Sequence, residues 1–103
     1  RNGQQIDGTT ESVMELVSLK AKFEAFNWHV LEMDGNDMDA VVAGFKNAKT
    51  FVGNGKPIVI IMKTIMGKGV DFMEGKHEWH GIAPSDEQLQ KALAQLPETF
   101  GDY

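Results

Sequence analysis

The sequence contains no cysteine among its 103 residues. Disulfides and thiolate metal sites are therefore excluded, and because the absence fits a reducing compartment we expect a cytoplasmic protein. Long apolar runs are also missing, since the longest one, Ile58 to Met62, is far short of the roughly 20 residues of a membrane-spanning helix. No signal peptide is recognisable, and we expect no membrane association.

Basic residues are few: ten Lys and Arg stand against fifteen Asp and Glu, for a net charge of −5. Without a basic stripe, we expect no nucleic-acid partner. A hydrophobic fraction of 42% is typical of a folded domain and argues against wholesale disorder. The polar opening "RNGQQIDGTT" lacks an initiator methionine, so we interpret these residues as a piece of a longer chain.

Turn signals and apolar spacing divide the first third of the chain. Two turn dipeptides bracket a short extended piece at residues 4–6. Apolar residues at roughly helical spacing predict one or two short helices within residues 10–26. A short strand is predicted around residues 28–31, ended by the Asp34-Gly35 turn.

A strand–helix–strand unit is predicted in the middle of the chain. The clearest helix covers residues 38–48, and Asn36 or Asp37 can cap its start by accepting a backbone N–H. The next apolar run, Ile58 to Ile61, is β-branched and does not alternate, as in a strand covered on both faces of a parallel sheet. These features predict an α/β fold built on a βαβ unit.

The glycine-rich stretch from residue 63 to residue 84 is predicted to be a long loop leaving the carboxyl end of that strand. Ligands bind at such ends in open parallel sheets, so this 63–84 loop is the leading candidate site. Its polar candidates are two lysines, which can meet an anion, and two histidines, which can donate hydrogen bonds: Lys63, Lys68, His77 and His80. A two-histidine metal site is disfavoured because no third ligand is nearby.

A last helix is predicted after the loop. Ser85 and Gln88 form a capping box, and Pro97 ends the helix. We expect its buried stripe to consist of the apolar residues at helical spacing, Leu89, Ala92, Leu93 and Leu96.

Four stretches together resemble a known family. In order, "RNGQQIDGT", "VLEMDGNDMDAVVAGFKNAK", "KPIVIIMKTIMGKGVDFMEG" and "HEWHG" resemble the N-terminal, thiamine diphosphate-binding section of transketolase, above all the N-terminal subunit of bacterial split transketolases. The resemblance implies that residues 1–103 are the C-terminal part of a three-layer, parallel-sheet diphosphate-binding domain. Residues 1–9 would then end the metal and cofactor motif, and residues 63–84 would be the active-site loop.

The resemblance also implies site residues. In that family a motif opening with Gly-Asp-Gly and closing with Asn binds thiamine diphosphate through Mg²⁺, and Asn2 matches the closing Asn. Its side-chain oxygen and the backbone carbonyl of Gln4 would ligate Mg²⁺, which prefers oxygen. Met66 would line the cofactor, and His80 would contact the diphosphate and the donor sugar, as the candidate catalytic residue. The role of His77 stays open.

The implied activity is transketolase chemistry of the pentose phosphate pathway, which moves a two-carbon ketol unit from a ketose phosphate to an aldose phosphate. The Gly-Asp-Gly opening and the glutamate that activates the cofactor lie outside these residues. We therefore expect these residues to be the C-terminal part of one half of a site, whose other half belongs to a pyrimidine-binding (C-terminal) subunit in a homo- or hetero-oligomer such as a dimer. Alternatives are a specialised sugar transketolase, another thiamine diphosphate enzyme such as deoxyxylulose-phosphate synthase, and a fragment that serves only assembly.

Overall fold

Two parallel strands, β3 (His29–Asp34) and β4 (Ile58–Lys63), form the centre of the computed structural model, which describes residues 1–97. Their ladder runs in register from the pair His29 and Ile58 to the pair Asp34 and Lys63. Branched side chains at the start of β4 suit the pleated backbone. The predicted parallel pairing is confirmed.

Helix α3 (Met38–Lys49) connects the two strands. The Asp37 carboxylate begins it by accepting the backbone N–H groups of Asp39 at 2.9 Å and Ala40 at 3.2 Å. Of the two caps considered, Asp37 is therefore the right one, and Asn36 has another partner. The βαβ unit follows from local signals: a cap, an apolar helix face and an unbroken β-branched run.

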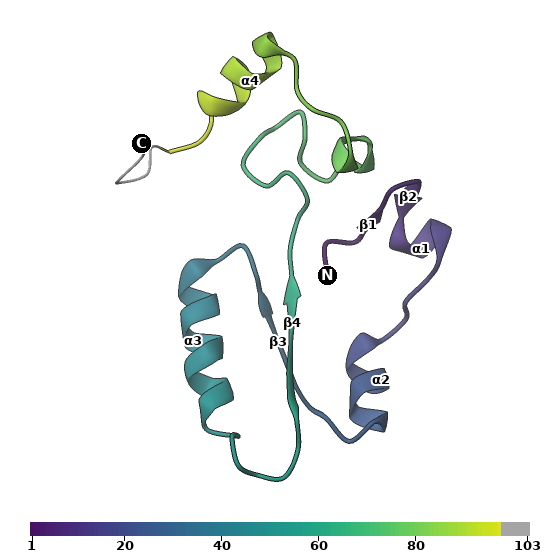
Figure 1. The fold of residues 1–103 in the computed structure, drawn as a ribbon, viewed down its shortest axis with the longest axis vertical. Helices are drawn as coiled ribbons and strands as arrows, with labels where there is room; N and C mark the ends of the chain where they lie inside the picture. Colours follow the sequence, from purple (N-terminus) through teal and green to yellow (C-terminus); the bar gives the residue numbers. More distant parts are fainter. Residues whose placement is uncertain (98–103) are drawn as a thin grey trace.

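The helices α3 and α2 (Leu19–Ala25) lie on opposite sides of the strand pair, so the frame has three layers (Figure 1). This arrangement confirms the predicted α/β fold. The packing is thin, however, because the Cα radius of gyration is 17.1 Å against about 13 Å for a compact domain of this length. Within residues 1–97 the buried apolar side chains are Ala48, Val70 and Ala92. β4 is half-buried, whereas the sequence predicts that both of its faces are covered.

The first nine residues form a small antiparallel hairpin of β1 (Gln4–Gln5) and β2 (Gly8–Thr9), followed by α1 (Thr10–Val13). We call residues 1–9 the N-terminal hairpin. Two backbone hydrogen bonds join its start to the end of β4. The Arg1 nitrogen donates to the Met62 carbonyl at 2.6 Å, and the Thr64 N–H donates to the Arg1 carbonyl at 3.0 Å. The hairpin is thereby held at the carboxyl end of the sheet.

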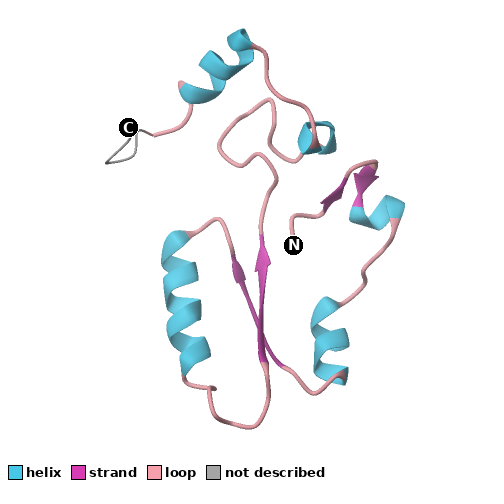
Figure 2. Cartoon of the chain, in the orientation of Figure 1, coloured by secondary structure: helices cyan, strands magenta, loops and turns pink. Residues whose placement is uncertain are grey.

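Beyond β4 the 63–84 loop is mostly irregular, as expected, but it contains a 3-10 helix, η1 (His77–His80) (Figure 2). Helix α4 (Asp86–Leu93) follows, and its predicted Ser85–Gln88 capping box is confirmed. The predicted buried stripe is wrong except at Ala92. Leu89 and Leu93 are 42% and 55% exposed, so no described element covers that side of the helix. Leu96 lies beyond the helix end, next to Gly69, and is 42% exposed. None of the helices in residues 1–97 has the length and apolar character needed to cross a bilayer.

Candidate functional site

A hollow of about 760 Å³ opens at the carboxyl ends of β3 and β4. The N-terminal hairpin, the strand ends and the 63–84 loop all contribute to its wall. The lining includes Asn2, Gln4, Asp34, Lys63, Ile65 and Gly75. A parallel sheet directs its ligands to this edge, so the topology brings the two sequence-predicted metal ligands to the expected place.

Asn2 and Gln4 face the same edge of the N-terminal hairpin. The Gln4 N–H donates to Oδ1 of Asn2 at 3.0 Å. The Thr10 N–H donates to the Gly3 carbonyl at 3.0 Å, so the next pair, Gln4 and Thr9, is a non-hydrogen-bonded pair of the ladder. The N–H and carbonyl of Gln4 therefore point away from β2, and the N–H on this side meets the Asn2 carboxamide. This arrangement offers two hard oxygen donors side by side, which fits Mg²⁺.

The Gln4 side chain has a partner of its own in the 63–84 loop. Its Nε2 donates to the Gly75 carbonyl at 3.0 Å, and the Gly75 N–H donates to the Met66 carbonyl at 2.8 Å. Its Oε1 is buried, with no hydrogen-bond partner in the part of the chain that is described. Met66 is half-buried and is not part of the hollow's lining; its backbone is linked to Gln4 through Gly75.

The structure separates the two histidines of η1. Nδ1 of His77 lies 3.3 Å from the Ile6 carbonyl oxygen, so this ring fastens η1 to the N-terminal hairpin. His80 is exposed at the other end of η1. It lines neither the hollow at the strand ends nor the second hollow, between the loop and α4, that is described below. Sequence reasoning left His77 unassigned, because its partner is a backbone carbonyl that lies 71 positions earlier.

The middle of the 63–84 loop closes on itself. Lys68 Nζ donates to Glu74 Oε1 at 3.0 Å, and the Gly69 N–H donates to Oε2 at 3.3 Å. These bonds, that from Lys68 first, lower the pKa of the Glu74 carboxyl. Gly67 has φ +67°, and a Cβ there would meet the Met73 backbone at 2.8 Å, so only glycine fits. Lys68 thus has a structural partner, whereas Lys63 lines the hollow.

A polar turn after β3 holds the start of the loop. Oδ1 of Asn36 accepts the Ile65 N–H at 2.7 Å, while the Asn36 N–H donates to the Asp34 carboxylate at 2.9 Å. Gly35 allows this approach, since a Cβ there would lie 2.6 Å from Cγ2 of Thr64. Sequence reasoning missed this role of Asn36. The available signal was an asparagine directly after an Asp-Gly turn, and it was read as a helix cap.

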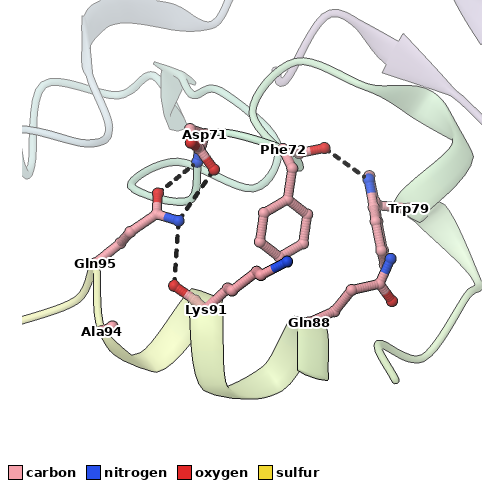
Figure 3. A pocket seen from close by; sticks show the side chains of 7 residues that line it. All are labelled: Asp71, Phe72, Trp79, Gln88, Lys91, Ala94 and Gln95. Atoms are coloured by element: carbon pink, nitrogen blue, oxygen red, sulfur yellow. Dashed lines mark hydrogen bonds between the residues drawn. The ribbon is translucent and has the colours of Figure 1, made fainter. Parts of the chain in front are cut away.

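A second hollow, of about 610 Å³, lies between the loop and α4 (Figure 3). Gln95 ties the two segments together: its Oε1 accepts the Asp71 N–H at 2.9 Å and its Nε2 donates to Oδ1 of Asp71 at 3.0 Å. The indole of Trp79 donates to the Phe72 carbonyl at 3.0 Å and packs edge-on against the Phe72 ring. Trp79 is thus a packing residue of the loop.

Charged groups near the first hollow form one ion pair at its rim. Arg1 Nη2 lies 3.5 Å from Oε1 of Glu11. The pKa of Glu11 is lowered, first by a hydrogen bond from its own backbone and then by the Thr10 hydroxyl, with smaller contributions from Arg1. Across residues 1–97 no group of three or more His, Cys, Asp or Glu side chains is placed to hold a metal ion.

Comparisons with known proteins agree on one family. The model for "Transketolase, thiamine diphosphate binding domain" matches residues 1–99. The chain is 42% identical over 98 residues to one of the subunits named for apulose-4-phosphate transketolase, from Phocaeicola vulgatus, a match that covers 95% of the chain and 34% of that relative. It is 40% identical over 95 residues to a 6-deoxy-6-sulfo-D-fructose transketolase subunit of a Clostridium species, covering 92% of the chain and 34% of the relative.

A solved structure shows the same fold. The crystal structure of transketolase from Campylobacter jejuni matches with a TM-score of 0.79 and 32% identity, over 91% of this chain and 14% of that one. The chain thus spans about a third of the length of the subunits that it resembles and about a seventh of the longer transketolase.

Proposed function

Because the chain belongs to the family of transketolase thiamine diphosphate-binding domains, we propose that it forms part of a transketolase active site. The enzyme would move a two-carbon ketol unit from a ketose phosphate to an aldose phosphate, with thiamine diphosphate and Mg²⁺. The observation that carries this proposal is the paired placement of the Asn2 carboxamide and the Gln4 carbonyl beside a hollow at the carboxyl end of a parallel sheet.

In this proposal Asn2 and Gln4 hold Mg²⁺ through Oδ1 and the backbone carbonyl, and the metal in turn binds the diphosphate. Thiamine diphosphate supplies an electron sink when it is bound. The protein supplies position: Met66 borders the cofactor, and His80, whose ring is exposed, contacts the diphosphate and the hydroxyls of the donor sugar. An imidazole suits both contacts because it can donate hydrogen bonds and accept a proton near neutral pH.

The rest of the site would come from other residues of the same domain, which carry the Gly-Asp-Gly opening of the motif, and from a second subunit. The names of two relatives identify them as subunits, which supports a hetero-oligomer. In this proposal the partner is the pyrimidine-binding subunit and the complex is cytoplasmic. Those names also favour a second candidate function. Both relatives are named for unusual sugars, apulose 4-phosphate and 6-deoxy-6-sulfo-D-fructose, so a specialised sugar transketolase is an alternative to an enzyme of the pentose phosphate pathway.

Ketol transfer by the complex of the full-length subunit and its partner tests the activity. A panel of ketose phosphates as donors and aldose phosphates as acceptors, extended to modified sugars, separates the two candidates. We expect transfer that requires both thiamine diphosphate and Mg²⁺ and that stops when EDTA removes the metal. If no donor–acceptor pair reacts in the presence of both cofactors, the proposed activity is wrong.

The role of His80 is tested in the same complex. We expect His80→Ala to raise the donor KM by roughly tenfold, the effect of losing one hydrogen bond of about 1.4 kcal/mol. Ile82→Ala is the control, because Ile82 lies two residues beyond His80 and is 61% exposed. Unchanged donor kinetics in His80→Ala would remove His80 from the site.

A further inference from the structure

One side chain connects the proposed metal site to the 63–84 loop. We propose that Gln4 is a positioning residue. Its side-chain carboxamide couples metal binding in the N-terminal hairpin to the position of the 63–84 loop. The inference rests on the proposed function, since the Gln4 carbonyl is one of the proposed metal ligands. It goes beyond that function by giving the side chain of the same residue a separate task.

Two groups of Gln4, its backbone carbonyl and its side-chain carboxamide, lie in different directions. Its backbone carbonyl points away from β2, to the side where Asn2 Oδ1 lies. Its side chain leaves the same Cα and donates to the Gly75 carbonyl at 3.0 Å. Because both groups belong to one residue of a hydrogen-bonded hairpin, a metal that fixes the carbonyl also fixes the origin of the side chain. The position of Gly75 therefore depends on the position of the metal ligand.

Two hydrogen bonds define the position of Gly75 in the loop. The carbonyl of Gly75 accepts from Gln4, and its N–H donates to the Met66 carbonyl at 2.8 Å. Gly75 has φ +71°, with no atom within 4 Å of the place a Cβ would take. Packing therefore does not hold this residue, and its two hydrogen bonds do. Removing one of them should free the loop on the side that leads to η1.

A second contact between the N-terminal hairpin and the 63–84 loop extends the coupling to His80. Nδ1 of His77 lies 3.3 Å from the Ile6 carbonyl, so the hairpin contacts the loop at two points. His80 lies on the same four-residue 3-10 helix as His77. A hairpin fixed by the metal would thus also fix the position of η1, which carries His80, the candidate contact with the donor sugar. Coupling of this kind is reciprocal: metal steadies the loop, and an ordered loop strengthens metal binding by the same factor.

The neighbouring residue provides a matched control. Gln5 has the same side chain and also has a buried Oε1 that lacks a partner within residues 1–97. Successive side chains of a strand point to opposite faces, and the bond to Gly75 comes from Gln4. Gln4→Met and Gln5→Met each replace an amide by an apolar chain of similar length, and both keep the backbone carbonyl.

The experiment uses the complex of the full-length subunit with its partner. Hydrogen exchange is followed in peptides covering residues 64–80, without ligand and with saturating thiamine diphosphate and Mg²⁺. We expect the ligands to slow exchange there in the wild type and in Gln5→Met. In Gln4→Met the cofactor still binds, but most of this added protection is lost, and Mg²⁺ affinity falls by about fivefold, the factor for one neutral hydrogen bond.

The outcomes separate the inference from the proposed function. A wild-type complex that binds no thiamine diphosphate would overturn the function, and the coupling with it. A complex that binds the cofactor and shows equal loop protection in wild type and Gln4→Met would overturn the coupling alone, as would equal losses in Gln4→Met and Gln5→Met. If Gln4→Met does not fold, Gln4→Glu replaces it, because a carboxylate keeps the length of the side chain but cannot donate to the Gly75 carbonyl at neutral pH. Retained protection in that variant would count equally against the coupling.

Discussion

The β3–α3–β4 frame and the region at its carboxyl end are built by different forces. The frame is a continuous parallel ladder with one helix against each side. The end region, made of the N-terminal hairpin and the 63–84 loop, contains two-residue strands and one four-residue 3-10 helix. Its two segments are joined by a few hydrogen bonds, which are a backbone bond from Thr64 to Arg1 and side-chain contacts of Gln4 and His77 with distant backbone carbonyls. The frame therefore depends on apolar burial and a ladder, and the site depends on a few polar contacts.

The difference predicts different responses to substitution. Losing an apolar group in the frame lowers the free energy of unfolding of the whole unit, because the ladder and the helices share it. Losing a polar contact in the end region loosens one segment and leaves the frame intact, since local openings cost less than global unfolding. Binding and stability should therefore separate along this boundary.

The largest effect is expected at the proposed metal ligand. Asn2→Ala removes the carboxamide oxygen and should weaken Mg²⁺-dependent binding of thiamine diphosphate by more than about 100-fold, because even outer-shell partners of metals contribute 10–100-fold. The melting temperature should stay close to that of the wild type, because Asn2 is exposed. Calorimetry on the complex of the full-length subunit with its partner measures the affinity for thiamine diphosphate. A thermal melt of the same complex measures the melting temperature. Asn54→Ala, at an exposed turn beyond α3, is the control; cofactor affinity retained in Asn2→Ala would contradict the assignment.

A frame substitution should show the reverse. Ile60 is half-buried in β4, opposite Leu31, and Ile60→Ala should lower the free energy of unfolding by about 2 kcal/mol, the low end for such truncations. Affinity for thiamine diphosphate in the folded fraction should be unchanged. Urea unfolding of the full-length subunit measures the stability. Val52→Ala should cost less than about 0.5 kcal/mol because Val52 is 70% exposed. A large loss of affinity in Ile60→Ala would break the distinction between frame and site.

The frame could be predicted from sequence because its signals are local. The β-branched run of β4 is contained in a few consecutive residues, and so, outside the frame, is the Ser85–Gln88 capping box of α4. The extent of burial was not predictable, since it depends on which other elements lie nearby. Leu89 and Leu93 have the right spacing for a buried stripe, and yet no described element covers them.

The candidate site could be predicted only in part. The resemblance pointed to Asn2 and Gln4, and the structure brings both to the carboxyl end of the sheet. The role of the Gln4 side chain could not be predicted, because its partner is a backbone carbonyl 71 positions away and any residue can supply one. The same holds for Asn36, whose partner is the Ile65 N–H. The sequence can mark the polar side chain, as with an asparagine directly after an Asp-Gly turn, but it leaves no pattern that identifies the distant backbone group.

Asn36 should give a smaller, local effect. Asn36→Ala leaves the Ile65 N–H without its acceptor, which should cost about 1 kcal/mol for one exposed hydrogen bond. Exchange should quicken in peptides covering residues 64–67 and stay unchanged in β3. Asn36→Asp keeps an acceptor oxygen and should restore the wild-type rate. If both variants exchange alike, the oxygen of Asn36 is not what holds the loop.

The smallest effect is expected at Glu74, and it should depend on pH. The bond from Lys68, followed by that from the Gly69 N–H, lowers the pKa of this carboxyl below its ordinary value of 4.5. The contact therefore steadies the loop fully above pH 4.5 and is lost as the pH falls through the lowered pKa of the folded state. At pH 7 Glu74→Gln should quicken exchange at residues 67–75 slightly, and 0.5 M salt should shrink the difference because exposed ion pairs are screened. Below the lowered pKa the two proteins should match, because both then have an uncharged side chain at position 74. A difference that persisted there would mean that packing around residue 74, and not its charge, closes the loop.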